Sequence, residues 1–154
     1  MEKIVIVTGG FDPVHAGHID YINAAAKLGD KLVIGLNSDD WLTRKKGKPF
    51  MNWIERFTIM DALKPVHAVI AFEDDDGTAI NCIKDVMERY PNNHYIFANG
   101  GDRINNNTPE LVWANQNNVP NLDFIFGVGG STKKNSSSWL LAKWNNVSKE
   151  SSAG

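Results

Sequence analysis

Short apolar runs recur along this chain, and helical patterns separate them. The runs occupy residues 4–7, 32–36, 68–72, 95–98 and 122–126, and the helical patterns lie around residues 17–28, 53–63, 79–90 and 109–117. Near-continuous apolar strands that alternate with helices are typical of a parallel sheet covered on both faces. The pattern predicts an α/β fold: a single Rossmann-like domain with a five-stranded, mostly parallel sheet and helices on both faces. Gly29 is expected to end the first helix.

A glycine-rich turn follows the first apolar run and leads into the first helical pattern. Residues 8–18 are Thr-Gly-Gly-Phe-Asp-Pro-Val-His-Ala-Gly-His. Such a turn presents backbone N–H groups and the positive end of a helix to an anion, and His15 and His18 add side-chain donors. The stretch is neither a P-loop nor a G-x-G-x-x-G dinucleotide fingerprint. We therefore expect a polyphosphate site here. The alternative is that the two histidines merely cap the helix or pack in the core.

This stretch resembles the HxGH motif of the cytidylyltransferase-like nucleotidyltransferases, and the resemblance extends from the first strand to residue 141. It implies that His15 and His18 contact the nucleotide phosphates and stabilise the transition state at the α-phosphorus. It also implies that the turn binds the nucleotide through Thr8, Gly9, Gly10 and Phe11, and that Asp12 binds the substrate.

Within this family, the layout is most similar to heptose-phosphate adenylyltransferase domains and to glycerol-3-phosphate cytidylyltransferases. Segments 28–30, 36–39, 72–74, 100–102 and 110–114 favour the heptose-phosphate enzymes. Two features differ: His67 stands where those relatives usually have an aspartate, and Gly-Gly-Phe-Asp-Pro also resembles pyridine-nucleotide adenylyltransferases.

A basic segment follows the second apolar run. Arg44, Lys45, Lys46 and Lys48 fall within five positions, and residues 37–49 are expected to form a mobile basic loop beside the turn. A solvated charge run is the alternative. The resemblance implies that lysines here contact substrate phosphates, with Lys46 the first choice as a catalytic residue and Lys45 the second, for substrate binding. Asp39 matches an acidic family position near the nucleotide or substrate.

The next helix is expected to begin after Asn52, a plausible N-cap. Arg56 in its first turns matches a family arginine that binds substrate phosphate. A guanidinium suits that role because it stays charged and offers paired donors. A surface salt bridge from Arg56 to Glu55 or Asp61 is the alternative.

Two further segments follow later strands. Gly101 and Asp102 resemble a Gly-Gly-Asp segment at the substrate pocket, although a plain turn explains the glycines as well. The serines Ser136, Ser137 and Ser138 resemble a family motif that grips the β- and γ-phosphates. The competing register is 131–133, and simple helix capping is the alternative role.

The reaction implied is nucleotidyl transfer from ATP or CTP to a small phosphate monoester, such as a sugar or polyol phosphate, with release of pyrophosphate. Mg²⁺ is expected to accompany the triphosphate, and no protein metal cage is expected because a third ligand beside His15 and His18 is missing. A non-catalytic nucleotide sensor of the same fold and a pyridine-nucleotide adenylyltransferase are the alternatives.

Composition limits the possible partners and location. The 154 residues carry a formal charge of −2, so no broad basic surface for nucleic acid is expected, and no apolar stretch has the length of a membrane span. The single cysteine, Cys82, excludes an internal disulfide and fits a reducing cytoplasm. The domain is expected to cover residues 1–144, with a polar, flexible tail at 145–154. A homodimer is expected by resemblance only.

Overall fold

The computed structural model describes residues 1–100, 108–130 and 140–145. Strands and helices alternate along most of the chain, as the sequence predicts. The elements are β1 (Lys3–Gly9), α1 (Ala16–Ala26), β2 (Lys31–Leu36), α2 (Asp39–Lys46), α3 (Trp53–Asp61), β3 (Ala68–Ala71), α4 (Ile80–Arg89), β4 (His94–Gly100), α5 (Pro109–Gln116) and β5 (Leu122–Val128).

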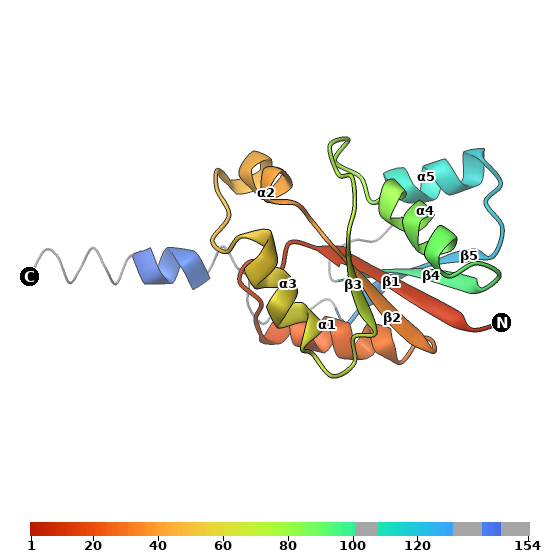
Figure 1. Ribbon diagram of the computed structural model, residues 1–154, viewed down its shortest axis with the longest axis horizontal. Coiled ribbons are helices and arrows are strands. Elements are labelled where there is room, and N and C mark those ends of the chain that lie inside the picture. The colour runs from red at the N-terminus through yellow and green to blue at the C-terminus, as the bar shows by residue number, and fades with distance from the viewer. Residues whose placement is uncertain (101–107, 131–139, 146–154) are drawn as a thin grey trace, which may run out of the picture.

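The five strands form one sheet in the order β3-β2-β1-β4-β5, and every neighbouring pair is parallel. The order reverses at β1, which pairs with β2 on one side and β4 on the other. Helices α1 and α3 cover one face, and α4 and α5 cover the other (Figure 1). This confirms the predicted Rossmann-like α/β class. In such sheets ligands bind outside the carboxyl ends of the strands, at the point where the order reverses.

The core has two parts, one on each face of the sheet. Side chains of β1 alternate between them because neighbouring residues of a strand point to opposite faces. Val5 and Val7 pack in the cluster that includes α1 and α3, while Ile4 and Ile6 pack in the cluster that includes α4. All four are fully buried. The sheet is therefore held from both sides, and its carboxyl edge is a rigid base for the loops that follow.

One expectation was wrong: residues 37–49 do not form a loop throughout, because α2 occupies most of them. Ser38 is the N-cap, and its side chain accepts a hydrogen bond from the Trp41 N–H at 3.0 Å. Gly47, with a φ of 95°, is the C-cap. Acidic residues in the first turn and basic residues in the last turn suit the helix dipole: Asp39, Asp40, Arg44, Lys45 and Lys46. The basic run is thus the end of a short, capped helix.

Gly29 also differs from its predicted role. The C-cap of α1 is Lys27, in the right-handed region, and Gly29 follows two residues later. A Cβ at Gly29 would lie 2.7 Å from the Lys3 carbonyl oxygen, too close for any other residue type without a shift. Gly29 therefore permits the close approach of the α1–β2 connection to β1. By contrast, Asn52 is confirmed as the N-cap of α3, accepting from the Glu55 N–H at 3.0 Å.

Residues 140–145 are helical, and the predicted division at 144/145 stays a prediction because most of the tail lies outside the described residues. Among the described helices, none has the length and apolar character needed to cross a bilayer.

Candidate functional site

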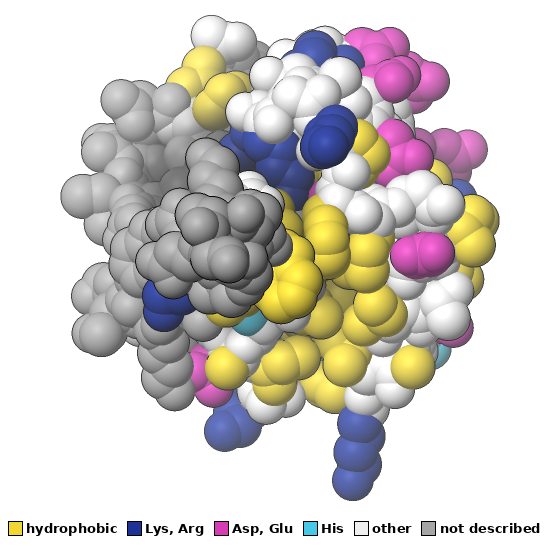
Figure 2. Space-filling model, turned by 90° about the vertical axis from the view of Figure 1, so that its left-hand side faces the viewer, with side chains coloured by type: hydrophobic (Ala, Val, Ile, Leu, Met, Phe, Trp, Pro, Cys, Tyr) yellow, Lys and Arg dark blue, Asp and Glu magenta, His cyan; other side chains and the backbone are white. Residues whose placement is uncertain are grey.

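The glycine turn lies at the carboxyl edge of the sheet, between β1 and α1. The Asn37 N–H, directly after β2, donates to the Gly9 carbonyl at 2.9 Å and fixes the start of the turn. A Cβ at Gly10 would lie 2.8 Å from Leu42 of α2, and Phe11 adopts a positive φ of 49°. Figure 2 shows this edge, where Lys and Arg side chains lie above an apolar area. The turn is therefore closely packed against α2 at the predicted ligand-binding edge.

His15 and His18 cap the N-terminus of α1 reciprocally. The Nδ1 atom of His15 accepts from the Gly17 N–H at 3.1 Å, and the Nδ1 atom of His18 accepts from the His15 N–H at 3.2 Å. The two rings stack with centroids 3.8 Å apart, and the Phe11 ring meets His18 edge-on at 4.9 Å. Capping, which the sequence left as the alternative role, is thus present in the structure. It uses only one nitrogen of each ring.

These contacts determine where each neutral imidazole carries its proton. A ring nitrogen that accepts a hydrogen bond has no proton, so both rings carry their proton on Nε2. The pKa of His18 is lowered to about 4, first by burial and second by the neighbouring His15. His18 is therefore a neutral Nε2–H donor near pH 7. Its orientation is set by the helix cap.

Asp12 is buried beneath the turn, 2% exposed, and its carboxylate binds the segment that follows α2. It accepts from the N–H groups of Phe50 at 2.6 Å and Met51 at 2.7 Å. The Lys46 ammonium lies 3.1 Å from the Asp12 carboxylate and donates to the Asp12 backbone carbonyl at 2.6 Å. Asp12 therefore attaches the end of the basic helix to the turn. The expectation that it binds substrate stays untested.

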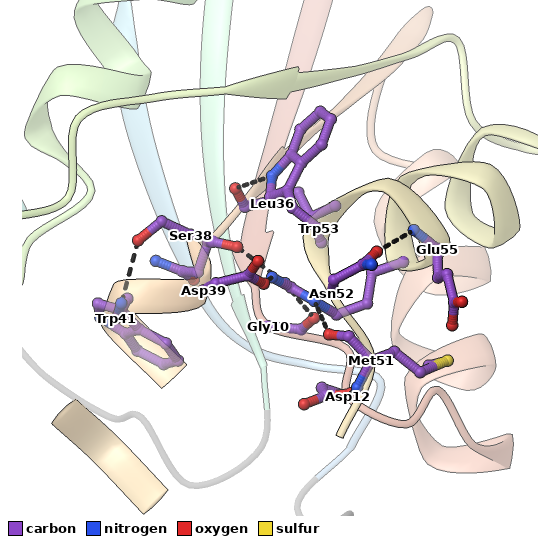
Figure 3. Close-up of polar contacts among 12 residues, drawn as sticks. Gly10, Asp12, Leu36, Ser38, Asp39, Trp41, Met51, Asn52, Trp53 and Glu55 are labelled. Atoms are coloured by element: carbon purple, nitrogen blue, oxygen red, sulfur yellow. Dashed lines mark hydrogen bonds and ion pairs between the residues drawn. The ribbon is translucent and has the colours of Figure 1, made fainter. Parts of the chain in front are cut away.

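Arg56 is fully buried in α3, with 0% exposure. It is not in the surface salt bridge with Glu55 or Asp61 that the sequence left open: its ion-pair partner is Asp39, at 2.7 Å. The guanidinium also donates to the Gly10 carbonyl of the turn and to the Met51 carbonyl, and Figure 3 shows Gly10, Asp39 and Met51 close to one another. A contact with substrate phosphate, the predicted role, stays a prediction. It would require displacement of these partners.

Asp74, three residues after the end of β3 and 2% exposed, is an organising residue that sequence reasoning did not single out. Its carboxylate accepts from the Asn37 side chain at 3.1 Å, and from the N–H at 2.8 Å and the hydroxyl at 2.7 Å of Ser38. The Arg44 guanidinium donates to its backbone carbonyl at 2.9 Å. Asp74 therefore holds the start of α2. A carboxylate shortly after a predicted strand was the signal that could have indicated it.

The structure brings most of the predicted site residues together around the turn: Gly9, Gly10, Phe11, Asp12, His15, His18, Asp39, Lys46 and Arg56. Thr8 precedes them as part of β1. The Lys45 ammonium lies 4.6 Å from the centroid of the Trp41 ring. The remaining predicted residues lie outside the described part of the chain: Gly101, Asp102, Ser136, Ser137 and Ser138. Within the described part, no group of three or more His, Cys, Asp or Glu side chains could hold a metal ion.

Comparison with known proteins adds independent information. Residues 6–138 match the family described as cytidylyltransferase-like. The bifunctional protein HldE of Erwinia tasmaniensis is 36% identical over 134 residues, covering 84% of this chain and 26% of that protein. HldE of Haemophilus ducreyi is 37% identical over 134 residues, covering 82% of this chain and 26% of that protein. The chain thus spans about a quarter of the length of these relatives.

Solved structures show the same fold. The lipopolysaccharide core biosynthesis protein from Thermoplasma volcanium GSS1 superposes with a TM-score of 0.64 at 26% identity, covering 81% of this chain and 97% of that one. A bifunctional NMN adenylyltransferase/ADP ribose pyrophosphatase from Francisella tularensis superposes with a TM-score of 0.63, covering 95% of this chain and 43% of that one. At 16% identity, this second likeness speaks for the fold alone.

Proposed function

The chain belongs to the cytidylyltransferase-like family, and from that premise we propose that it is a nucleotidyltransferase that acts on a small phosphate monoester. It transfers a nucleoside monophosphate from a nucleoside triphosphate to the acceptor and releases pyrophosphate. The observation that carries the proposal is the paired cap of His15 and His18. Because each Nδ1 is held by a backbone N–H, the two rings carry Nε2 protons at a glycine turn in a fixed orientation.

The chemistry requires little proton transfer. A phosphate oxygen of the acceptor attacks the α-phosphorus, an O–P bond forms, and the bond to the bridging oxygen of pyrophosphate breaks. The acceptor phosphate is already an anion near neutral pH, so no strong general base is needed. Catalysis then depends on positioning and on stabilising the negative charge that builds up around the α-phosphorus.

The residues around the turn suit these tasks. His15 and His18 would donate Nε2–H groups to the α-phosphate, and the backbone of Gly9, Gly10 and Phe11 would bind phosphate oxygens. Lys46, held next to the turn by Asp12, would supply positive charge. Lys45, Asp39 and Asp12 remain candidates for substrate contacts, as do the segments with Gly101, Asp102 and Ser136–Ser138.

Magnesium enters this scheme with the substrate. A triphosphate carries Mg²⁺ on its own oxygens, and this ion would neutralise part of the charge on the leaving pyrophosphate. The described residues offer no three-carboxylate or histidine cluster for a separate metal. The protein groups named above would therefore bind the Mg²⁺–triphosphate complex as one substrate.

A sugar phosphate is the acceptor class that has the most support. The similarity to HldE proteins and to the Thermoplasma lipopolysaccharide core biosynthesis protein favours it. So does the resemblance of several sequence segments to heptose-phosphate adenylyltransferase domains. That resemblance makes ATP the first nucleotide to test and CTP the second.

The test is pyrophosphate release with Mg²⁺, in which ATP and CTP are each combined with a panel of acceptors. The panel contains heptose 1-phosphate, glycerol 3-phosphate and nicotinate mononucleotide. Release with one pair, strongly reduced in a folded His18→Asn variant, supports the proposal and identifies both substrates. Release with ATP and nicotinate mononucleotide alone would favour a pyridine-nucleotide adenylyltransferase. Tight nucleotide binding without release in any combination would favour a sensor.

Two finer proposals accompany this function. We propose a homodimer, supported by the family resemblance and by two exposed apolar side chains: Phe50, just before α3, and Ile54, in its first turn, which are 59% and 65% exposed. Light scattering across a range of protein concentrations would test it. We also propose a cytoplasmic location, supported by the single free cysteine, Cys82, which is buried.

A further inference from the structure

Arg56 joins four separate segments through one buried guanidinium. Its Nε donates to the Met51 carbonyl at 3.0 Å. One terminal nitrogen donates to the Gly10 carbonyl at 3.0 Å and to the Asn37 carbonyl at 2.8 Å. The other donates to the Asp39 carboxylate at 2.7 Å. The glycine turn, the end of β2, the start of α2 and the entry to α3 therefore meet at this side chain.

The bond to Gly10 determines how the turn presents its backbone. A trans peptide unit is planar, and its C=O and N–H point in opposite directions. Because the Gly10 carbonyl points to the buried guanidinium, the N–H of Phe11 points away from it. The positive φ of Phe11, 49°, belongs to the same conformation. Arg56 thus fixes the orientation of one of the donors that the proposed function assigns to the nucleotide phosphates.

A direct contact between Arg56 and a substrate phosphate fits these observations poorly. The guanidinium has no exposed surface, and its charge is already paired with the Asp39 carboxylate. A phosphate would have to displace Asp39 and two or more backbone carbonyls. Each of these bonds is charge-assisted, and their loss would leave backbone carbonyls such as that of the buried Asn37 without a donor.

We propose that Arg56 is a positioning residue for nucleotidyl transfer. It holds the Gly10–Phe11 peptide in the conformation that binds the triphosphate, and Asp39 orients its guanidinium. This inference rests on the proposed function. In this role Arg56 supports binding of the nucleoside triphosphate by holding the turn, and it does not bind the acceptor phosphate.

The first test is Arg56→Lys, with kcat, the KM of the acceptor and the affinity for Mg²⁺–ATP measured beside thermal unfolding. A lysine keeps the charge, but one ammonium cannot reach all four partners. We expect kcat to fall about 100-fold and ATP binding to weaken, because a misplacement of about 1 Å is enough for such a loss. The acceptor KM should stay within about three-fold. Glu55→Gln, an exposed change of one charge in the same helix, is the matched control and should alter none of these values.

Two results with Arg56→Lys would overturn the inference. A rise of the acceptor KM by ten-fold or more with an unchanged kcat would make Arg56 an acceptor ligand. A lower Tm with unchanged kinetic constants would make it a purely structural residue. If the wild-type protein released no pyrophosphate with any substrate pair, the proposed function itself would fail, which is a distinguishable outcome.

If Arg56→Lys does not fold, Asp39→Ala tests the positioning role instead. The Asp39 side chain is 41% exposed and tolerates replacement better. Loss of this carboxylate leaves the Arg56 charge unpaired. Under the positioning role, kcat falls and the acceptor KM is unchanged. A lower acceptor KM, expected if the released charge attracts the acceptor phosphate, would contradict the inference, and so would unaltered kinetics.

Discussion

Two groups of polar side chains surround the glycine turn, and they differ in what their hydrogen-bonding atoms face. His15 and His18 are partly exposed, and their described cap contacts use one ring nitrogen each. Asp12 and Arg56 are 2% and 0% exposed, and their charged atoms contact the surrounding backbone, Lys46 and Asp39. The histidines are oriented by their Nδ1 caps and by ring contacts with each other and with Phe11, whereas Asp12 and Arg56 use their charged groups in contacts within the protein.

This difference separates the two ways in which a residue can serve a binding turn. A residue that stabilises a reacting phosphate must direct a donor to the ligand, and a second contact that fixes its orientation improves it. A residue whose donors and acceptors are used internally acts through the backbone that it holds. Replacing His15 or His18 should therefore affect mainly the rate. Replacing Asp12 or Arg56 should also lower the free energy of unfolding.

The largest effect is expected from His18→Asn. The Asn side-chain oxygen can take the place of Nδ1 and accept from the His15 N–H, but nothing replaces the Nε2–H donor. The fold and the helix cap should persist, while pyrophosphate release falls about 10³-fold, the usual size for loss of a transition-state donor. Steady-state kinetics and circular dichroism on the same preparation measure both quantities.

His18→Gln is the matched control for that prediction. Its terminal amide nitrogen lies nearer to the position of Nε2, whereas its side chain lacks an acceptor at the position of Nδ1. We expect it to retain more activity than His18→Asn and to lose more stability. Equal activity in the two variants would mean that the Nε2 donor is not what the reaction uses.

The next effect, on stability, is expected from Asp12→Ala. This change leaves the N–H groups of Phe50 and Met51 and the ammonium of Lys46 without the carboxylate that binds them. Breaking a buried ion pair by removing one partner typically costs about 3–5 kcal/mol. Urea unfolding of the variant and the wild type gives the difference.

Asp75→Ala provides the comparison for Asp12→Ala, because the Asp75 side chain is 81% exposed and lies 3.9 Å from Arg44. Its free energy of unfolding should change by less than about 0.5 kcal/mol. If Asp12→Ala were equally mild, the carboxylate would not be holding the segment after α2, and its predicted role as a substrate ligand would gain support.

A smaller effect follows from the lowered pKa of His18. Between pH 6.5 and about 4 the unfolded chain binds a proton at His18 that the folded chain does not bind, so the protein loses stability as the pH falls through this range. The loss is about 3 kcal/mol at most. It should be complete near pH 4 and absent above pH 7.

The His18→Asn variant removes this titration and leaves the other groups in place. From pH 7 to pH 4 the urea midpoint of the wild type should therefore fall more than that of the variant. If the wild type is the more stable protein at pH 7, the two midpoints converge; if it is the less stable, they diverge. Parallel pH curves would show that His18 titrates normally in the folded state.

The sequence predicted the sheet and the turn well because both depend on local patterns. Apolar runs in strands and the glycine–histidine stretch are contiguous, and their structures follow from neighbouring residues. The role of Arg56 could not be predicted in this way. Its partners Gly10, Asn37 and Asp39 are distant in the chain, and only the folded structure brings them to one buried point.

The helix α2 was missed for a different reason. Its start signal, Ser38 followed by two aspartates, and its stop signal, Gly47, are local and readable. The prediction of a loop was based on the run of basic residues and did not use these two capping signals. Asp74 shows a further limit: a carboxylate after a strand suggests an organising or binding role, but its contacts with Ser38 and Arg44 depend on how β2 and β3 pair.

The smallest effect is expected from Ser38→Ala, and it tests how far the buried network extends from the turn. The Ser38 hydroxyl donates to Asp74 and accepts from the Trp41 N–H, so it links the cap of α2 to the sheet. Loss of an N-cap side chain costs about 1 kcal/mol. Because α2 ends at Lys46, a less firmly held start of α2 should also lower the rate of pyrophosphate release a few-fold.

Ser38→Thr is the control, because it keeps the hydroxyl and should preserve both the stability and the rate. If Ser38→Ala lowers the stability and leaves the rate unchanged, the positioning network ends at Asp12 and Arg56.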